Sequence, residues 1–278
     1  MKNRSFFLLT CLGFGFAFLY VPILLLIIYS FNENRLVTVW SGFSTQWYGE
    51  LLRDKNILDA AWVSLRVAFF SATFATALGT IAGMVMARFG RFRGRTMFSG
   101  MLSAPLVMPE VITGLSLLLM FVALESLFGV PQGRGVSTIT IAHATFTMAF
   151  VAVIVQSRLS QMDESIEEAA LDLGARPAKV FFAITLPIIS PAIIAGWLLA
   201  FTMSLDDLVI ASFTSGPSST TLPMVVFSSV RLGVSPKINA LATLLVLVAA
   251  VTILIAAYFM RRQESMRARE AAAATADG

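Results

Sequence analysis

The sequence has 278 residues, of which 57% are hydrophobic and 13% are charged. Soluble domains carry about 25% charged residues, so this composition excludes a soluble globular protein and indicates a chain that folds in lipid. The net charge of +4 does not predict a nucleic-acid partner, because the basic residues gather at the ends of apolar segments, where they set orientation in a membrane. The single cysteine, Cys11, excludes a disulfide within the chain.

Apolar segments long enough to cross a bilayer occur along most of the chain. A transmembrane helix needs about 20 mostly apolar residues, and six segments reach this length. The first lacks a small-residue cleavage site, so we expect it to stay in the membrane. We therefore predict an all-α polytopic membrane protein. The predicted spans are residues 6–31, 61–87, 97–124, 138–157, 187–213 and 238–260.

Lysine and arginine residues are unevenly distributed between the two sides that these spans define. The N-terminus, the segments after the second and fourth spans, and the C-terminal tail hold most of the 20 basic residues. Cytoplasmic segments are enriched in lysine and arginine. The sequence thus predicts that both termini are cytoplasmic, together with the segment 158–186 and the tail 261–278.

Two segments on the predicted outer side are expected to form short helices. Residues 43–58 include Trp47 and Tyr48, whose rings suit the headgroup level of a bilayer. Residues 221–232 are expected to begin a helix near Pro223. The sequence leaves open whether these helices receive an external partner or only pack over the spans.

The segment between the fourth and fifth spans predicts a helical hairpin. Gly174 is expected just past the end of its first helix, and Pro177 in the first turn of its second. Two interpretations remain open: a docking surface for a soluble partner, or a solvated connector in which Ser165 and Glu168 form a local capping box. The first helix combines acidic residues with one apolar face at helical spacing. That face consists of Ile166, Ala169, Ala170 and Leu173.

The hairpin carries a motif that is known from one family. Residues 168–170 (Glu-Ala-Ala), Gly174 and residues 184–187 (Ile-Thr-Leu-Pro) resemble the signature loop of the permease subunits of binding-protein-dependent ABC importers. The resemblance implies a type I ABC importer permease fold, in which this loop forms coupling helices that fit a cleft in an ATPase subunit. The residues to which it gives this role are Glu168, Ala169, Ala170 and Gly174 at the contact, and Ile184, Leu186 and Pro187 at the start of the fifth span.

The same resemblance implies an assembly. Importers of this family have two ATPase subunits and two such loops, and this chain has one loop. We therefore expect a heterodimer with a second homologous permease chain, two ATPase subunits and a periplasmic binding protein. The sequence has no glycine-rich phosphate loop and no metal-ligand spacing. We expect a non-catalytic subunit without a cofactor or metal of its own, with ATP and magnesium on the ATPase subunits.

Two adjacent aspartates, Asp206 and Asp207, lie within the fifth predicted span, where charge is expensive and usually functional. Neighbouring helical residues point about 100° apart, so both cannot face one pathway squarely. We expect Asp207 to face the pathway and Asp206 to pair with Arg66; the reverse assignment stays open, because a local unwinding would change these angles. An acidic and aromatic lining suits an organic cation; the open alternative is a buried Asp–Arg pair between helices. The pathway face would contain Trp197, Phe201 and Ser204.

Prolines interrupt the third predicted span immediately before its one carboxylate. Pro105 and Pro109 break or kink a helix, and Glu110 follows them. Glu110 either lines a cavity at the break or lies at the end of a half-helix and reaches water. In the fourth span, His143 is expected to form a hydrogen bond between helices, with a proton relay as the alternative.

The resemblance extends over nearly the whole chain and narrows the expected substrate. It implies import of a polyamine, putrescine or spermidine, from a periplasmic binding protein across the bacterial inner membrane by alternating access. Asp206, Asp207 and Glu110 would offer transient charge to the cation. The outer residues 47–54 are similar to the second permeases of putrescine importers. The segments that resemble spermidine/putrescine importer permeases are residues 104–114, 204–213, 215–217, 222–223 and 233–240.

We expect residues 1–278 to form a single transmembrane domain. It would contain the first span at 6–31, a permease core at 61–260 that includes the coupling loop 158–186, and the tail 261–278. Three other functions remain open. They are an ABC permease for another small substrate, an ion-coupled secondary carrier that uses Glu110, His143 and the aspartates as a relay, and a membrane sensor or scaffold that does not transport.

Overall fold

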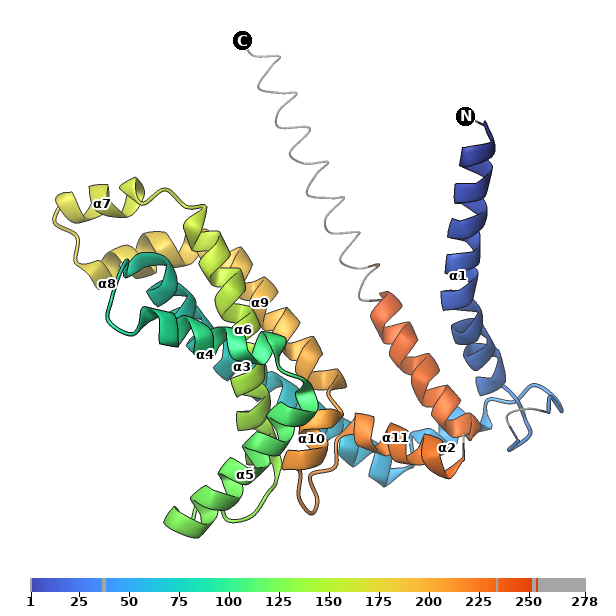
Figure 1. Ribbon diagram of the computed structural model, residues 1–278. Coiled ribbons are helices and arrows are strands. Elements are labelled where there is room, and N and C mark those ends of the chain that lie inside the picture. The colour runs from blue at the N-terminus through green and yellow to red at the C-terminus, as the bar shows by residue number, and fades with distance from the viewer. Residues whose placement is uncertain (1, 37–38, 234, 252–253, 255–278) are drawn as a thin grey trace. The chain divides into compact units, whose positions relative to one another are not determined.

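The computed structural model describes residues 2–36, 39–233, 235–251 and 254, and the regular secondary structure of these residues is helical (Figure 1). The chain divides into two compact units, residues 1–55 with 228–278 and residues 56–227. The labelled helices are α1 (Lys2–Ser30), α2 (Gln46–Leu51), α3 (Lys55–Arg88), α4 (Arg95–Val107), α5 (Glu110–Phe128), α6 (Val136–Ser160), α7 (Ser165–Asp172), α8 (Pro177–Val180), η1 (Phe181–Thr185), α9 (Leu186–Asp206), α10 (Val209–Thr214) and α11 (Leu222–Leu232).

Within the described residues, five helices are long and apolar enough to cross a membrane. The predicted first, second and fourth spans each coincide largely with one of them. Of the predicted sixth span, the described part is a shorter apolar helix, Pro236–Val251, and most of residues 252–260 lie outside the described residues. The five helices are Phe7–Ser30, Lys55–Arg88, Glu110–Phe128, Val136–Ser160 and Pro177–Asp206.

The third predicted span is not one continuous helix. It is divided into α4 and α5, and Met108 and Pro109 between them are extended, with ψ of 138° and 136°. The residue before a proline is driven out of the helical region by the proline ring, which explains why α4 ends ahead of Met108. The expected break is confirmed at Pro109, whereas Pro105 lies inside α4 and the single boundary of 97–124 is wrong.

The fifth predicted span is displaced toward the N-terminus. Its helix begins at Pro177, continues through the π-helical turn η1 and ends at Asp206. Asp207 is extended, with ψ of 125°, and α10 follows as a separate short helix. The predicted end at residue 213 is therefore wrong, because the unwinding falls between the two aspartates.

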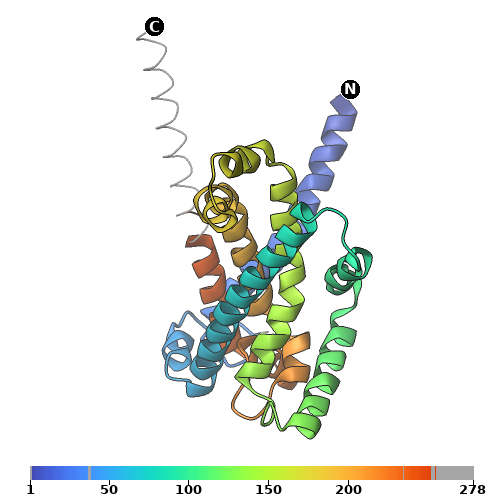
Figure 2. The ribbon, with the colours of Figure 1, turned by 90° about the vertical axis from the view of Figure 1, so that its left-hand side faces the viewer.

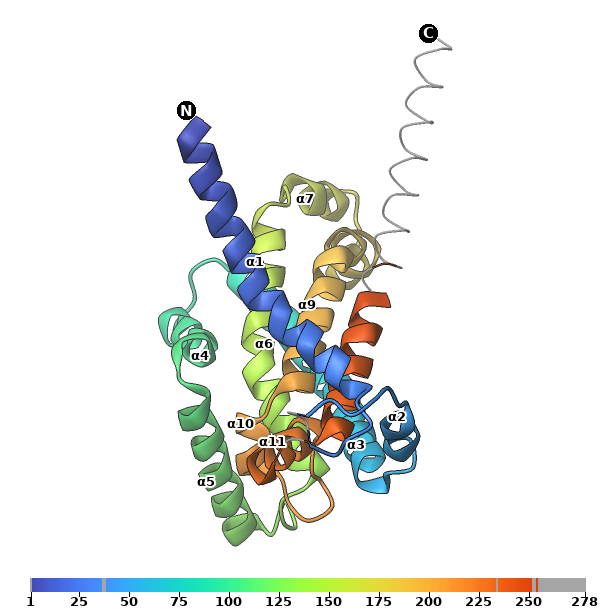
Figure 3. The same ribbon diagram turned by 90° about the vertical axis from the view of Figure 1, so that its right-hand side faces the viewer.

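The core of the second unit forms around α6, which runs alongside α3 and α9 (Figures 2 and 3). Gly79 and Gly83 lie one turn apart on α3, and a Cβ atom on either would come 2.7 Å from a backbone carbonyl of α6. These glycines therefore let the two backbones touch, as small residues do in membrane helix pairs. The buried side chains among the three helices are Ala72, Ala75, Val151, Val155, Leu159, Ile189 and Ala200.

In the first unit, Asn32 organises the segment that follows α1. Its side-chain amide donates to the carbonyl of Val39 at 2.8 Å, and its Oδ1 accepts from the backbone N–H of Ser41 at 3.1 Å. The indole of Trp47, on α2, donates to the Asn32 carbonyl at 2.6 Å. Trp47 is consequently buried, and the short helices predicted within 43–58 and 221–232 are confirmed as α2 and α11.

Candidate functional site

The predicted hairpin between the fourth and fifth spans forms as α7, a glycine turn and α8. Gly174 has φ of +82°, a left-handed conformation that favours glycine. Its N–H donates to the Leu171 carbonyl at 2.8 Å, and the N–H of Ala175 donates to the Ala170 carbonyl at 3.1 Å. These two bonds form a Schellman motif, which ends α7 and turns the chain toward α8.

The apolar face of α7 is uncovered. No residue of α7 is buried, and the Ile166 and Leu173 side chains are 44% and 89% exposed. Glu168 is also exposed, and its carboxylate has no hydrogen bond or ion pair with any described residue. An apolar ridge beside an unpaired acid is therefore open to a partner.

The alternative capping box at Ser165 and Glu168 does not form. The N-cap of α7 is Glu164, without a side-chain capping bond. The Ser165 backbone N–H and hydroxyl instead bond to Asp163, and these bonds lower the pKa of that carboxyl. Glu168 is thus left without the local role that the connector interpretation assigned to it.

A node of charged groups attaches the hairpin to the core. Arg88, the last residue of α3, donates from Nε to Glu167 Oε2 at 2.7 Å and from Nη1 to Glu164 Oε1 at 3.1 Å. Nη1 also donates to the Leu159 carbonyl of α6 at 3.1 Å. The other carboxylate oxygen of Glu167 accepts from the Thr185 hydroxyl at 2.5 Å. One arginine and one glutamate therefore connect α3, α6, the hairpin and η1.

Sequence reasoning missed this node. In the sequence, Arg88 is one of several basic residues that follow the second predicted span, and Glu167 is one of several acids in the first helix of the hairpin. The two residues are 79 positions apart, so no local spacing relates them. Their side chains are only 15% and 18% exposed. Arg88 is distinguished from other basic residues at the ends of spans by the burial of its side chain. Burial of this kind cannot be read from the sequence.

The predicted residues at the start of the fifth span lie where the helix widens. Ile184 belongs to the π-helical turn η1, and Leu186 and Pro187 open α9. Proline has no N–H to donate to the preceding turn, and π-turns are frequent at functional sites. Thr185 in this turn is the residue that bonds to Glu167. The second half of the motif is thus bonded to Glu167, the residue that precedes its first half.

Of the two aspartates among the predicted pathway residues, Asp207 is the one that has partners. The Nδ1 atom of His143 lies 2.7 Å from the Ser204 hydroxyl, which confirms the expected hydrogen bond between α6 and α9. Its Nε2 atom lies 3.2 Å from Asp207 Oδ1, within ion-pair distance but outside hydrogen-bond geometry. Asp207 Oδ1 accepts from the N–H of Ala211 at 2.8 Å. The side chains of His143 and Asp207 are 1% and 8% exposed.

Asp206 is exposed, and no ion pair joins it to Arg66 within the described part of the chain. The expected division, with Asp206 paired and Asp207 open, is therefore reversed. The helix ends between the two residues, so their side chains do not follow the 100° rule on which the expectation depended. Ser204 is buried against His143 and does not share the surroundings of the aromatic residues.

Trp197 and Phe201 come together with α3. Their rings stack with centroids 5.2 Å apart, and Trp197 meets Phe69 edge-on at 5.8 Å. The Trp197 indole donates to the Thr73 hydroxyl at 3.2 Å. Phe201 lines an open hollow of about 490 Å³ with Trp62, Leu65, Arg66, Phe69 and Phe70. This aromatic hollow holds Arg66 and none of the predicted acids.

Glu110 is the first residue of α5 and is exposed. A carboxylate in the first turn of a helix is favoured by the helix dipole. Of the two expected positions, the structure therefore gives the end of a half-helix. It does not bring Glu110 to the aromatic hollow.

Residues 79–266 match the sequence profile of the family described as "Binding-protein-dependent transport system inner membrane component". The chain is 61% identical over 267 residues to the putrescine transport system permease protein PotI of Escherichia coli (strain K12), which covers 96% of this chain and 95% of the relative. It is 42% identical over 250 residues to the spermidine/putrescine transport system permease protein PotC of the same strain, covering 90% and 92%. A chain in the crystal structure of a bacterial alginate ABC transporter, bound to its periplasmic protein carrying an alginate pentasaccharide, has the same fold. Its TM-score is 0.71 at 15% identity, and the match covers 91% of this chain and 92% of that one.

Proposed function

Because this chain belongs to the family of inner membrane components of binding-protein-dependent transport systems, we propose that it is the transmembrane permease subunit of an ATP-driven polyamine importer. The substrate class comes from the relatives, since PotI is named for putrescine and PotC for spermidine and putrescine. The observation that carries the transport mechanism is the α7–α8 hairpin, whose apolar ridge and unpaired Glu168 are open to an ATPase subunit.

The proposed assembly places this chain in the bacterial inner membrane as one transmembrane domain with six spans and both termini in the cytoplasm. The basic residues around the hairpin support this orientation. A second homologous permease chain supplies the other coupling loop, and two ATPase subunits hold ATP and magnesium. This chain has no catalytic residue, metal or cofactor of its own in the proposal. A periplasmic polyamine-binding protein delivers the substrate to the outer face.

Force from the ATPase subunits reaches the spans through the Arg88–Glu167 node. When ATP draws the two ATPase subunits together, each coupling hairpin moves with its ATPase. Glu167 is bonded both to Arg88 on α3 and to Thr185 at the start of α9, so a displacement of α7 acts on two spans at once. Packed helices have a few discrete arrangements, and such a displacement switches the bundle between inward-open and outward-open states.

The cation pathway in this proposal uses the exposed acids and the aromatic hollow. Asp206 offers a carboxylate next to the unwound end of α9, and Glu110 offers one at the start of α5. Trp197 and Phe201 present ring faces that attract ammonium groups. Asp207 contributes by holding His143 and the start of α10 in place. Each contact is weak enough to release the substrate, as transport requires.

The test is uptake of radiolabelled putrescine by proteoliposomes that contain the purified complex, with its ATPase subunits and binding protein. We expect uptake that requires ATP and stops when the ATPase subunits are left out. Uptake without any ATPase subunit would favour an ion-coupled carrier. ATP-dependent uptake of another solute, with none of putrescine or spermidine, would retain the ABC importer and reject the polyamine.

A further inference from the structure

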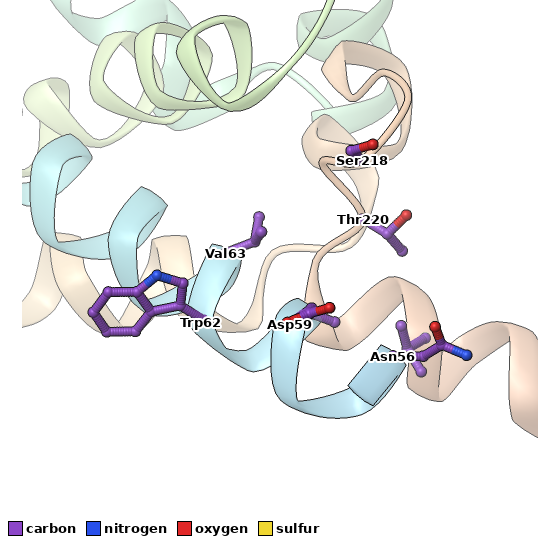
Figure 4. Close-up of a pocket in the computed structure, with 8 residues that line it drawn as sticks. Asn56, Asp59, Trp62, Val63, Ser218 and Thr220 are labelled. Atoms are coloured by element: carbon purple, nitrogen blue, oxygen red, sulfur yellow. The ribbon is translucent and has the colours of Figure 1, made fainter. Parts of the chain in front are cut away.

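A second hollow opens at the end of α3 opposite to Arg88. It has a volume of about 510 Å³ and lies between the first turns of α3 and the segment that joins α10 to α11. Figure 4 shows Asp59 and Val63 on α3, with Ser218 and Thr220 on the other wall. Its lining also includes Asn56 and Trp62. We call it the Asp59 pocket.

The charge in this pocket is a single carboxylate. Asp59 has no ion pair or hydrogen bond with any residue that the structure describes. No lysine or arginine lines the pocket. The pocket therefore presents a net negative charge, with the Ser218 and Thr220 hydroxyls across from the acid as further acceptors.

The wall opposite to α3 is held in place. The Ser64 hydroxyl of α3 accepts the N–H of Leu222 at 2.7 Å, just beyond Thr220 along the chain. The Ser219 hydroxyl, buried next to Ser218, accepts the N–H of Gly216 at 2.7 Å. These bonds attach the segment 216–222 to α3 and to itself.

We propose that the Asp59 pocket binds one primary ammonium group of the amine on its way into the bundle. An alkylammonium carries three N–H donors and one positive charge, which match a carboxylate and two hydroxyl acceptors. Val63 and the Trp62 ring give apolar and π surface to the attached methylene groups. This inference rests on the proposed function, because the amine is the substrate named there.

The Asp59 pocket and the aromatic hollow share one lining residue on α3. Trp62 lines both. Asp59, Trp62, Arg66 and Phe69 follow one another at helical spacing along one face of α3. The Arg66 guanidinium, which lines the aromatic hollow, repels a cation that advances from Asp59. The pocket is thus a waiting position, in which the ammonium group stays until a change in the bundle moves the Arg66 guanidinium away or brings a carboxylate to it.

The experiment measures binding of radiolabelled putrescine to the purified complex in nanodiscs, without the binding protein, and uptake by the same preparation once that protein is added. We expect Asp59→Asn to weaken binding at least tenfold, since it removes a charge-assisted bond. Asp59→Glu should stay within a few-fold of the wild type, which excludes misfolding as the cause. The matched control is Glu50→Gln, which removes an exposed acid that the pocket does not contain.

Competing ligands test whether one ammonium group is sufficient for binding to the Asp59 pocket. Butylamine, with one ammonium group, should displace putrescine from the wild type, and butanol should not. The proposal is overturned if Asp59→Asn binds putrescine as the wild type does, or if the wild type shows no saturable binding. Failure of the proposed function has a different result, which is absence of ATP-dependent putrescine uptake by the wild-type complex.

Discussion

At the scale of single residues, side chains that the sequence presents as similar have separate roles. Asp206 and Asp207 are neighbours, yet one is exposed and the other is buried against His143. Glu167 and Glu168 are also neighbours, and only Glu167 reaches Arg88. The reason is geometric: consecutive helical residues point in different directions, and a break in the helix changes those directions again. In each of these two pairs, one acid therefore contacts other parts of the fold and its neighbour is exposed.

The Arg88–Glu167 pair is expected to hold the coupling hairpin to α3. Arg88→Met leaves a mostly buried carboxylate without its cation, so the free energy of unfolding should fall. A double-mutant cycle with Glu167→Gln should give a coupling energy of about 0.5–3 kcal/mol. The measurement is denaturant unfolding of the purified chain in detergent, accompanied by the ratio of putrescine imported to ATP hydrolysed, which should also fall.

The control for this cycle is Arg91→Met, in the same segment. Arg91 is exposed and forms no ion pair within the described part of the chain. Its loss should leave both quantities close to wild type. A coupling energy of zero between Arg88 and Glu167 would show that the pair does not transmit force.

At the scale of elements, glycine positions decide how closely helices approach. Gly79 and Gly83 of α3 contact the backbone of α6, whereas Gly100 of α4 has no atom within 4 Å of the position a Cβ would take. The prolines act in the other direction. Pro109 separates α4 from α5, and Pro187 follows a π-helical turn. Small residues thus join elements, and Pro109 divides two of them.

Gly83→Ala should destabilise the second unit. The added Cβ would lie 2.7 Å from the Ala152 carbonyl oxygen and 3.1 Å from the Gln156 nitrogen, and backbone atoms cannot move aside as a side chain does. Overpacking of this kind costs about 1–3 kcal/mol. Gly100→Ala is the matched control, because alanine there meets nothing and favours a helix. Thermal unfolding in detergent should separate the two variants, and equal melting temperatures would contradict the close approach of α3 and α6.

At the scale of the whole molecule, the chain has an apolar surface that its own fold does not cover. The side chains of α1 from Phe7 to Leu25 are all exposed, as are Ile166 and Leu173 of the hairpin. Lipid suits the first surface and cannot account for the second, which lies beside charged groups. This exposed ridge is the surface on which we propose that an ATPase subunit docks.

Glu168→Lys should detach the ATPase subunits. The substitution reverses the charge of an exposed residue on the uncovered face, so it should leave the fold intact and lose the partner. We expect less ATPase protein when the complex is purified through a tag on this chain. Glu50→Lys makes the same charge change away from the hairpin and should have no effect. Recovery of the ATPase at wild-type yield with Glu168→Lys would reject the docking surface.

Local sequence patterns predicted the spans with continuous apolar runs and the hairpin with its glycine turn. These features depend only on residues close together in the sequence, so the sequence predicts them. They are the span length, the Schellman glycine at position 174 and the apolar face of α7. The pathway and ATPase-contact roles of the individual site residues stay predictions. The patterns gave wrong ends for the third and fifth spans. A proline ends one helix and an unwound pair of residues ends the other, although the sequence around both positions is apolar.

The amino-acid sequence by itself determined that this protein folds in a membrane and exposes a helix–glycine–helix motif, since composition and periodicity act over a few turns. Tertiary structure alone decided that Arg88 binds Glu167, that His143 meets Ser204 and Asp207, and that Asp59 lines a pocket without a partner among the described residues. The first two contacts join residues 79 and 61 positions apart. Such partners are chosen by how helices pack, and no local pattern records that choice.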